Sequence, residues 1–281
     1  MNFNLKNFLI ADCIHGVMVW PTNDQVIGQC LSLYGEFAEN ENIMLSKLIS
    51  EGDTAIDIGA NIGTQTISLS NKVGEKGKVI AFEPQNIISQ CLQTNLTLND
   101  ITNVSVHKSA ISNKSGWAKM NISEYAQIGR YGEAGITKTG SRVKTIKLDE
   151  IDTQKCNLIK IDVEGHEWEV IQGGQEFLKI HKPNLYMEAK NGIEGTKKYL
   201  KWLLENGWRC YWHFAWWCRT NNYRKNTNII FEGDGDMNIA AVHNEKSQPN
   251  NLLEITDPKE EWDANKYKQF YETLGIDLIY P

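Results

Sequence analysis

The stretch TAIDIGANIGTQT (54–66) decides the fold. Residues 54–58 predict a strand, and residues 64–72 predict a helix that opens directly after Gly63. Gly59 and Gly63 lie in the turn between them. Because glycine has no side chain, the backbone of this turn can approach a ligand closely. A strand that leads into a helix through such a loop is typical of open α/β sheets, which bind ligands at the carboxyl ends of their strands.

The same alternation of strands and helices continues along the chain. Further strands are predicted at 78–82, 103–107, 156–162 and 184–189, and further helices at 86–98, 167–180 and 196–205. Two more strands, 208–214 and 237–243, have no helix between them and predict an antiparallel hairpin at the sheet edge. Strands that alternate with helices predict a mainly parallel sheet, here of seven strands, with helices on both faces.

Three additions flank or interrupt this core. Residues 1–38 are expected to form an N-terminal extension of strands and turns, and residues 39–245 the main domain. An insertion at 115–147 combines strands with a glycine-rich loop. Residues 246–281 predict a C-terminal tail, whose helix would dock through four apolar side chains, namely Trp262, Tyr267, Phe270 and Leu274.

The composition is that of an ordinary globular protein, with 41% hydrophobic and 23% charged residues. The net charge of −6 lacks the basic footprint of proteins that bind duplex nucleic acid, so no such partner is expected. No apolar run approaches the ~20 residues needed to cross a bilayer. Six cysteines without CxxC spacing are typical of reduced, buried thiols, which favours a cytoplasmic protein. Nothing in the sequence decides the oligomeric state.

Two acids follow neighbouring strands of the predicted sheet. Asp57 ends the first strand, and Glu83 follows the next, where an acid can accept hydrogen bonds from both ribose hydroxyls of an adenosine cofactor. The loop has the pattern D-x-G-x-N-x-G, from Asp57 through Gly59 and Asn61 to Gly63, and lacks the G-x-G-x-x-G of a dinucleotide site. An acid-led loop suits a ligand with a cationic amine and no phosphate. This favours S-adenosylmethionine, whose ammonium would meet Asp57.

A second group of polar residues follows another apolar strand, in LIKIDVEGHE (158–167). Acids and a histidine crowded beside an apolar strand are costly unless they serve a site. His166 is the candidate general base because its ordinary pKa of about 6.5 leaves it largely neutral at pH 7. Asp162, Glu164, or Glu188 after the next strand would orient it or the substrate. A surface histidine without a catalytic role fits the sequence equally well.

The carboxylates of Asp162, Glu164 and Glu188 also suit Mg²⁺, which prefers hard oxygen ligands. Carboxylates at strand ends more often bind substrate directly, so we expect no metal here. Two other regions offer contacts to an acceptor: the aromatic region 202–226 and the glycine-rich segment 124–140. The candidates in them are Trp216, Tyr223 and Arg224, and, as part of a lid, Tyr125, Arg130 and Tyr131. A packed loop without function explains either region equally well.

In wording and order, three stretches resemble FkbM-type methyltransferases. They are YGEF with GDTAIDIGANIGTQT (34–66), AFEP (81–84), and KTIKLDEI with LIKIDVEGHEWEVIQGG (144–174). The resemblance extends over roughly residues 30–245. It implies a class I, Rossmann-like methyltransferase fold that takes a methyl group from S-adenosylmethionine and releases S-adenosyl-L-homocysteine. It also implies a hydroxyl acceptor on a sugar, a glycan or a similar small molecule, whose oxygen must lie in line with the S–CH₃ bond.

The resemblance assigns roles position by position. Asp57, Gly59, Asn61 and Gly63 match the cofactor loop, and Glu83 matches the ribose acid. The other matches are Ala110 near the adenine, Glu36 in an entry motif that closes over the cofactor, and Asp162, Glu164 and His166 at the methyl-transfer end, where Asp162 would also contact the cofactor. Two alternatives stay open: a non-catalytic module that binds an adenosine cofactor, and a nucleotide-dependent Rossmann oxidoreductase, which the missing glycine pattern disfavours.

Overall fold

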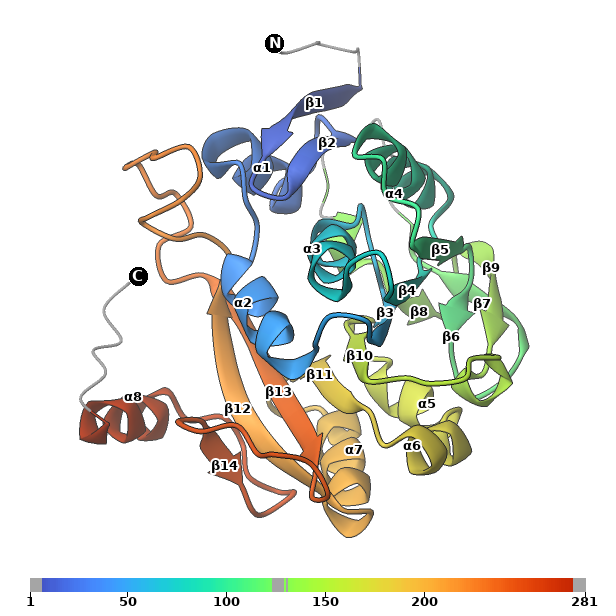
Figure 1. The fold of residues 1–281 in the computed structure, drawn as a ribbon, viewed down its shortest axis with the longest axis vertical. Coiled ribbons are helices and arrows are strands. Elements are labelled where there is room, and N and C mark those ends of the chain that lie inside the picture. Colours follow the sequence, from blue (N-terminus) through green and yellow to red (C-terminus); the bar gives the residue numbers. More distant parts are fainter. Residues whose placement is uncertain (1–6, 123–128, 130, 275–281) are drawn as a thin grey trace.

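An eight-stranded sheet forms the centre of the computed structural model, which describes residues 7–122, 129 and 131–274, with only the backbone of residue 131 (Figure 1). In chain order the strands of this sheet are β3 (Thr54–Ile58), β4 (Lys78–Phe82), β5 (Val104–His107), β10 (Leu158–Ile161), β11 (Asn184–Glu188), β12 (Trp208–Trp216), β13 (Gly235–His243) and β14 (Leu253–Ile255). Their order across the sheet is β14-β12-β13-β11-β10-β3-β4-β5.

The five strands from β5 to β11 run parallel, as the alternation of strands and helices predicts. The seven predicted strands are all present, and β12 and β13 form the predicted antiparallel pair. The prediction that this hairpin forms the edge was wrong. β13 lies between β11 and β12, and the short strand β14 pairs with β12 to make an eighth strand. Three residues are too few to show a strand period in the sequence, so β14 was missed.

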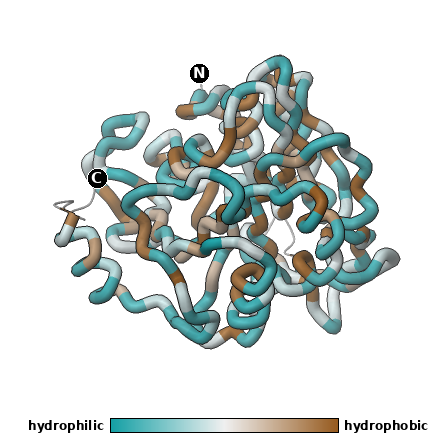
Figure 2. Tube along the Cα trace, turned by 60° about the horizontal axis from the view of Figure 1, so that its bottom comes forward, coloured by the Kyte–Doolittle hydropathy of each residue, from teal (hydrophilic) through white to brown (hydrophobic). Residues whose placement is uncertain are grey.

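Helices cover both faces of the sheet. The helices α2 (Glu39–Leu48) and α3 (Thr64–Val73) pack on the face to which Ala55 points, whereas Ile56 and Ile58 belong to the core on the opposite face. That second core contains α5 (Glu167–Gln172), α6 (Gln175–His181) and α7 (Glu194–Glu205). Figure 2 shows the resulting distribution, with apolar segments concentrated in the interior and hydrophilic segments along the outside. Burial on both faces explains why the central strands are nearly continuous apolar runs.

The N-terminal extension contains the expected strands and turn, and it also contains a helix that was not predicted. Its hairpin, β1 (Phe8–Cys13) with β2 (Gly16–Pro21), is followed by a helix, α1 (Ile27–Tyr34). The hairpin packs against α4 (Asn86–Leu98), where the Asn95 and Asn99 side chains hydrogen-bond to the backbone of β2. The extension is therefore anchored on the main domain by side-chain amides.

The insertion forms a sheet of its own. Its strands are β6 (Ala110–Ile111), β7 (Gly116–Met120), β8 (Ile136–Thr137) and β9 (Ser141–Ile146), and the short helices η1 (Tyr131–Glu133) and η2 (Leu148–Glu150) accompany them. They pair in the order β6-β9-β7-β8, on the right of Figure 1. The expectation of strands in this segment is thus confirmed, while the proposed limits of the domain and its insertion stay a prediction.

The described part of the tail contains α8 (Ala264–Thr273), which docks through Tyr267 and Tyr271. Trp262 and Phe270 pack partly against the same core, but Leu274 is 41% exposed, so its predicted docking role was wrong. One helical turn separates Tyr267 from Tyr271, which places both rings on the buried side. All six cysteines are buried and unpaired, as expected. In the described ranges, no helix is long and apolar enough to span a membrane.

Candidate active site

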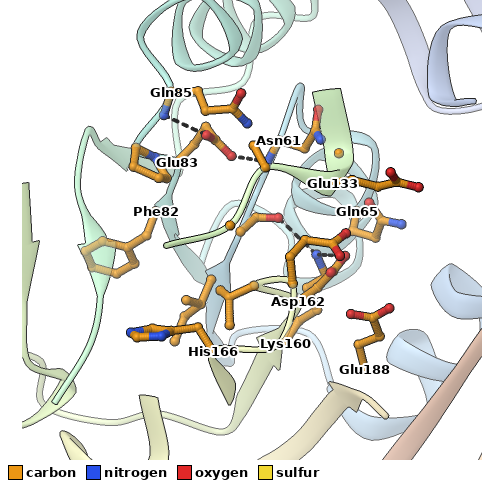
Figure 3. A pocket seen from close by; sticks show the side chains of 18 of the residues that line it. Asn61, Gln65, Phe82, Glu83, Gln85, Glu133, Lys160, Asp162, His166 and Glu188 are labelled. Carbon is orange, nitrogen blue, oxygen red and sulfur yellow. Dashed lines mark hydrogen bonds and ion pairs between the residues drawn. The ribbon is translucent and has the colours of Figure 1, made fainter. Parts of the chain in front are cut away.

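A cavity of about 500 Å³ opens at the carboxyl ends of β3, β4, β10 and β11 (Figure 3). This size lies within the range of small-molecule sites, about 300–1,000 Å³. The loops that follow these four strands all contribute lining residues, as do α2, the insertion and β13. The parallel strands therefore bring the polar residues that follow them in the sequence to one place.

The loop after β3 comes very close to the loop after β10. Gly59 has φ = +80°, and a Cβ atom at this position would lie 1.8 Å from the carbonyl oxygen of Asp162. Gly63 caps the N-terminus of α3 at φ = +96°, where a Cβ would meet the side chain of Leu92. Asn61 takes the left-handed conformation between them and lines the cavity. The loop needs its two glycines for close packing.

Glu83 is buried at the cavity wall, with 3% of its surface exposed. Its carboxylate accepts hydrogen bonds from the backbone N–H of Asn61 (3.0 Å) and of Gln85 (2.8 Å), as Figure 3 shows. Burial raises the pKa of this carboxyl to about 7, although the two amides pull it down. Glu83 thus ties the β3 and β4 loops together, and its position at the wall fits the ribose role expected from the sequence.

Asp57 does not line the cavity, contrary to its expected contact with a cofactor ammonium. It is fully buried, accepts a hydrogen bond from the Thr66 hydroxyl (2.6 Å), and lies 3.6 Å from the Lys160 ammonium. Lys160 also donates to the carbonyl of Gly59 (3.1 Å) and to Asp162 (3.2 Å). Burial alone would lower the pKa of Lys160, but the attraction of Asp162 and Asp57 outweighs it and raises that pKa. A lysine within the apolar strand LIKI was the signal that we missed.

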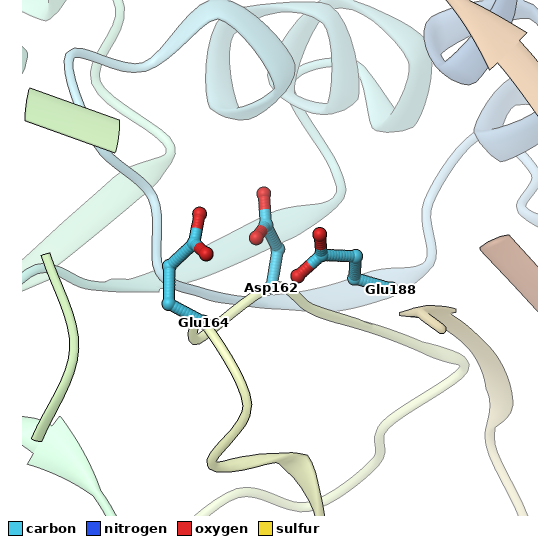
Figure 4. Close-up of side chains that lie close together, drawn as sticks. All are labelled: Asp162, Glu164 and Glu188. Carbon is cyan, nitrogen blue, oxygen red and sulfur yellow. The ribbon is translucent and has the colours of Figure 1, made fainter. Parts of the chain in front are cut away.

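Three carboxylates converge at the other end of the cavity (Figure 4). Oxygens of Asp162, Glu164 and Glu188 all lie within 4.8 Å of one another, a donor set that could hold a divalent cation. Lys190 contacts two of them, at 2.6 Å from Glu164 and 3.2 Å from Glu188. Burial, followed by repulsion from Asp162 and Glu164, raises the pKa of Glu188 to about 9. Its Oε2 atom is buried without a hydrogen-bond partner in the described structure.

Further acids border the carboxylate cluster and have no local signal in the sequence. Glu41, from α2, accepts hydrogen bonds from Gln65 and Asn238, both 3.1 Å away. Burial raises the pKa of Glu41 to about 8 and that of Asp236 to about 6. Asp236 accepts a hydrogen bond from the Trp217 indole (2.6 Å). These residues come from α2, α3, β13 and the segment after β12, so only the tertiary structure brings them to the cavity.

His166 lines the cavity, but it is already engaged. Its Nε2 lies 2.9 Å from the Ser112 hydroxyl, and its Nδ1 lies 3.6 Å from Glu169. Burial lowers its pKa, which keeps the ring neutral at neutral pH. In Figure 3, His166 and Glu188 stand on opposite sides of the pair formed by Lys160 and Asp162. Its role as general base stays a prediction, as does an adenine contact by Ala110, which lines the cavity after β5.

Gly63 lies outside the cavity lining, and so do four other predicted residues. Glu36 is buried and receives two hydrogen bonds from the Arg219 guanidinium (2.6 and 2.9 Å) and one from the backbone N–H of Tyr223. It holds the segment after β12 in place instead of contacting the cavity. Tyr223 and Arg224 bond to Asp12 of the extension.

Trp216 borders a separate cavity, and the next residue, Trp217, lines the main one because the chain turns at the end of β12. Gly132 and Glu133 of η1 line the main cavity too. The side chain of Tyr131, together with Tyr125 and Arg130, lies outside the described residues.

The fold is that of a class I methyltransferase: a mainly parallel sheet in which β13 and β14, near one edge, run antiparallel, with a cavity at the strand ends. Residues 57–210, more than half of the chain, match the model of the methyltransferase FkbM domain. The chain belongs to this family.

The individual proteins described next share between 14% and 32% sequence identity with this chain. The hexuronic acid methyltransferase AglP of Haloferax volcanii is 32% identical over 134 residues, which is 46% of this chain and 53% of AglP. The chain therefore spans about half the length of this curated relative. A methyltransferase FkbM from Methylobacillus flagellatus has a TM-score of 0.47 at 18% identity, covering 68% of this chain and 43% of that one. An O-methyltransferase from Thermotoga maritima has a TM-score of 0.49 at 14% identity, covering 89% and 87%.

Proposed function

We propose that this protein transfers the methyl group of S-adenosylmethionine to a hydroxyl group of a sugar, a glycan or a similar small molecule. One observation carries the proposal: a single cavity has a buried acid suited to ribose at one end and three converging carboxylates at the other. Carboxylates bind polyhydroxylated molecules by accepting their hydroxyl hydrogens. The name of the relative AglP, a hexuronic acid methyltransferase, supports a sugar as the acceptor.

The cofactor fits the first end of the cavity. Glu83 would accept the ribose hydroxyls, because its carboxylate lines the cavity and the backbone amides of Asn61 and Gln85 fix its position. Ala110 and Ser109 line the wall where the adenine is expected. When bound, S-adenosylmethionine supplies an electrophilic methyl group and leaves as S-adenosyl-L-homocysteine.

The chain's own residues then have to bind the acceptor and remove one proton. Glu188 in its ionised form, which is favoured above its pKa of about 9, would take the proton of the acceptor hydroxyl, since its Oε2 atom has no other partner in the described structure. Asp162 and Glu164 would orient the neighbouring hydroxyls. Bound S-adenosylmethionine would supply the methyl carbon to the acceptor oxygen and would keep the electron pair of the broken S–C bond on sulfur, while the proton of the acceptor would move to the Glu188 carboxylate. His166 is the alternative base.

A calorimetric titration with S-adenosyl-L-homocysteine tests the cofactor site. We expect micromolar binding, about −8 kcal/mol, that weakens at least tenfold in Glu83→Gln. Glu176→Gln, a substitution on the exposed surface of α6, is the matched control and should bind like the parent protein. A folded protein that does not bind the ligand would contradict the proposal.

The acceptor is tested separately with methyl-labelled cofactor and a panel of neutral sugars, uronic acids and glycans. The expected product is a methyl ether, identified by NMR from the shift of the carbon that carries the methylated oxygen. A methyl group found on nitrogen or carbon would rule out O-methylation. Cofactor binding without turnover on any member of the panel would favour the non-catalytic binding module.

A further inference from the structure

The carboxylate cluster already contains a cation, the ammonium of Lys190. Lys190 follows β11 by two residues and lies 2.6 Å from Glu164 and 3.2 Å from Glu188. Both distances are those of charge-assisted hydrogen bonds. Although burial lowers the pKa of Lys190, the two glutamates raise it above its ordinary value, so the ammonium keeps its charge at neutral pH.

A divalent cation would need the same carboxylates. Mg²⁺ and Ca²⁺ bind carboxylate oxygens at about 2.0–2.6 Å and depend on negatively charged ligands. Two of the three acids in this cluster are already paired with Lys190, and the third, Asp162, receives a hydrogen bond from Lys160. Metal binding would therefore require at least one ammonium to leave, at the cost of repulsion between two like charges.

We propose that Lys190 takes the place of a divalent metal ion in this site, as a positioning residue that holds Glu164 and Glu188 in the arrangement that the acceptor meets. The inference rests on the proposed function, because the cluster lies at the acceptor end of the cavity. It adds that methyl transfer by this protein needs no metal. The single ammonium of Lys190 between Glu164 and Glu188 would also fix the distance between their two carboxylates.

The test is a calorimetric titration in which Mn²⁺ is the only ligand. It compares four proteins: the parent chain, Lys190→Met, Lys190→Arg, and the control Lys197→Met. Lys197 is a half-exposed lysine of α7 that pairs with Glu261, outside the cavity lining. Lys190→Met keeps the length of the side chain but removes the charge, which frees both glutamates. Thermal melting monitored by circular dichroism establishes that each variant is folded.

We expect the parent chain, Lys190→Arg and Lys197→Met to show no Mn²⁺ binding below millimolar concentration. Lys190→Met should bind Mn²⁺ at least tenfold more tightly than the parent, and the double variant Glu164→Gln/Lys190→Met should lose this binding. A parent chain that binds Mn²⁺ with micromolar affinity would overturn the inference. So would a folded Lys190→Met that binds no Mn²⁺, because Lys190 would then not be filling a cation site.

Once an acceptor is known, turnover gives a second readout. The parent chain should keep its rate within twofold after treatment with EDTA, and Lys190→Met should become slower but respond to added Mn²⁺. Loss of parent activity in EDTA that Mn²⁺ restores would overturn the inference while leaving the methyltransferase intact. A failure to find any acceptor would affect the proposed function alone, since the Mn²⁺ titration does not depend on turnover.

Discussion

The two ends of the cavity are built on different principles. At the cofactor end, Glu83 is held by the backbone amides of Asn61 and Gln85, which come from two loops close in sequence. At the acceptor end, Glu164 and Glu188 are held by the side chain of Lys190. Backbone amides stay in place when a side chain is replaced, whereas an ion pair is lost with either partner. We therefore expect the acceptor end to be the more sensitive to substitution.

The electrostatics differ in the same way. Burial is the largest cause of the raised pKa of Glu83, and hydrogen bonds from the backbone of Gln85 and Asn61 oppose it. For Glu188 and Glu41, repulsion from neighbouring acids adds to burial. Carboxylates crowded into one site retain protons or recruit cations. The carboxyl groups at the acceptor end thus affect one another's pKa values, whereas the cofactor end depends on one acid, Glu83.

The largest expected effect distinguishes the two candidate bases. Glu188→Gln should lower kcat by about 10²–10⁴-fold, the usual contribution of a general base, while the affinity for S-adenosyl-L-homocysteine stays within threefold. His166→Gln is the matched comparison and should lower kcat less than tenfold, because Ser112 and Glu169 already engage this ring. Single-turnover rates measure both. If His166→Gln lowered kcat more than Glu188→Gln did, His166 would be the base, and the carboxylates at the acceptor end would take no part in proton transfer.

The second effect concerns Lys160, which joins the two ends. Lys160→Met leaves the carboxylate of Asp57 buried without a cation, so the free energy of unfolding should fall by about 3–5 kcal/mol. Urea unfolding measures this loss. The double variant Asp57→Asn/Lys160→Met should recover much of it, because no uncompensated charge then remains. Equal stability of the single and double variants would show that Lys160 acts through packing instead of charge.

A third and smaller effect tests why the loop after β3 needs a glycine at position 59. Gly52→Ala should cost about 1–2 kcal/mol, because an L-residue at φ = +81° is strained while the surrounding space is open. Gly59→Ala at φ = +80° adds a clash with the Asp162 carbonyl, so it should cost more and also weaken cofactor binding. Unfolding and calorimetric titrations compare the two. Equal costs would mean that the β3 and β10 loops separate easily.

The smallest effect is a pH dependence of cofactor binding. The pKa of Glu83 is about 7, so its carboxylate is lost as the pH falls below 7, together with an acceptor for the ribose hydroxyls. The dissociation constant of S-adenosyl-L-homocysteine should therefore rise as the pH is lowered from 8 to 6, by at most about tenfold per unit. Glu83→Gln should flatten this profile. A profile that keeps its slope in the variant would assign the titration to another group.

Local sequence patterns correctly predicted the structural features that depend on residues close together in the chain. The α4 helix has the predicted limits, and the seven strands of the core lie where alternation placed them, because apolar periodicity follows directly from burial on a face. The short strand β14 and the helix α1 were missed, since a few residues carry too little periodicity. Trp216, Tyr223 and Arg224 were chosen for their chemistry alone, and none of the three lines the main cavity, although their neighbour Trp217 does.

The sequence by itself determined the class of the fold and the local geometry of the loops after β3 and β4, which line one end of the cavity. Gly59, Asn61 and Glu83 lie beside the turns that they form, so their spacing along the chain already encodes their geometry. At the other end the sequence predicted the three carboxylates of Asp162, Glu164 and Glu188, but only the tertiary structure decided which residues pair with them. The pairing register of β10 with β3 sets Lys160 beside Asp57, and that of β11 with β13 sets Glu188 beside Asn238. Such registers depend on how whole strands pack, and a charge partner that is remote in the chain leaves no mark on the residues around it.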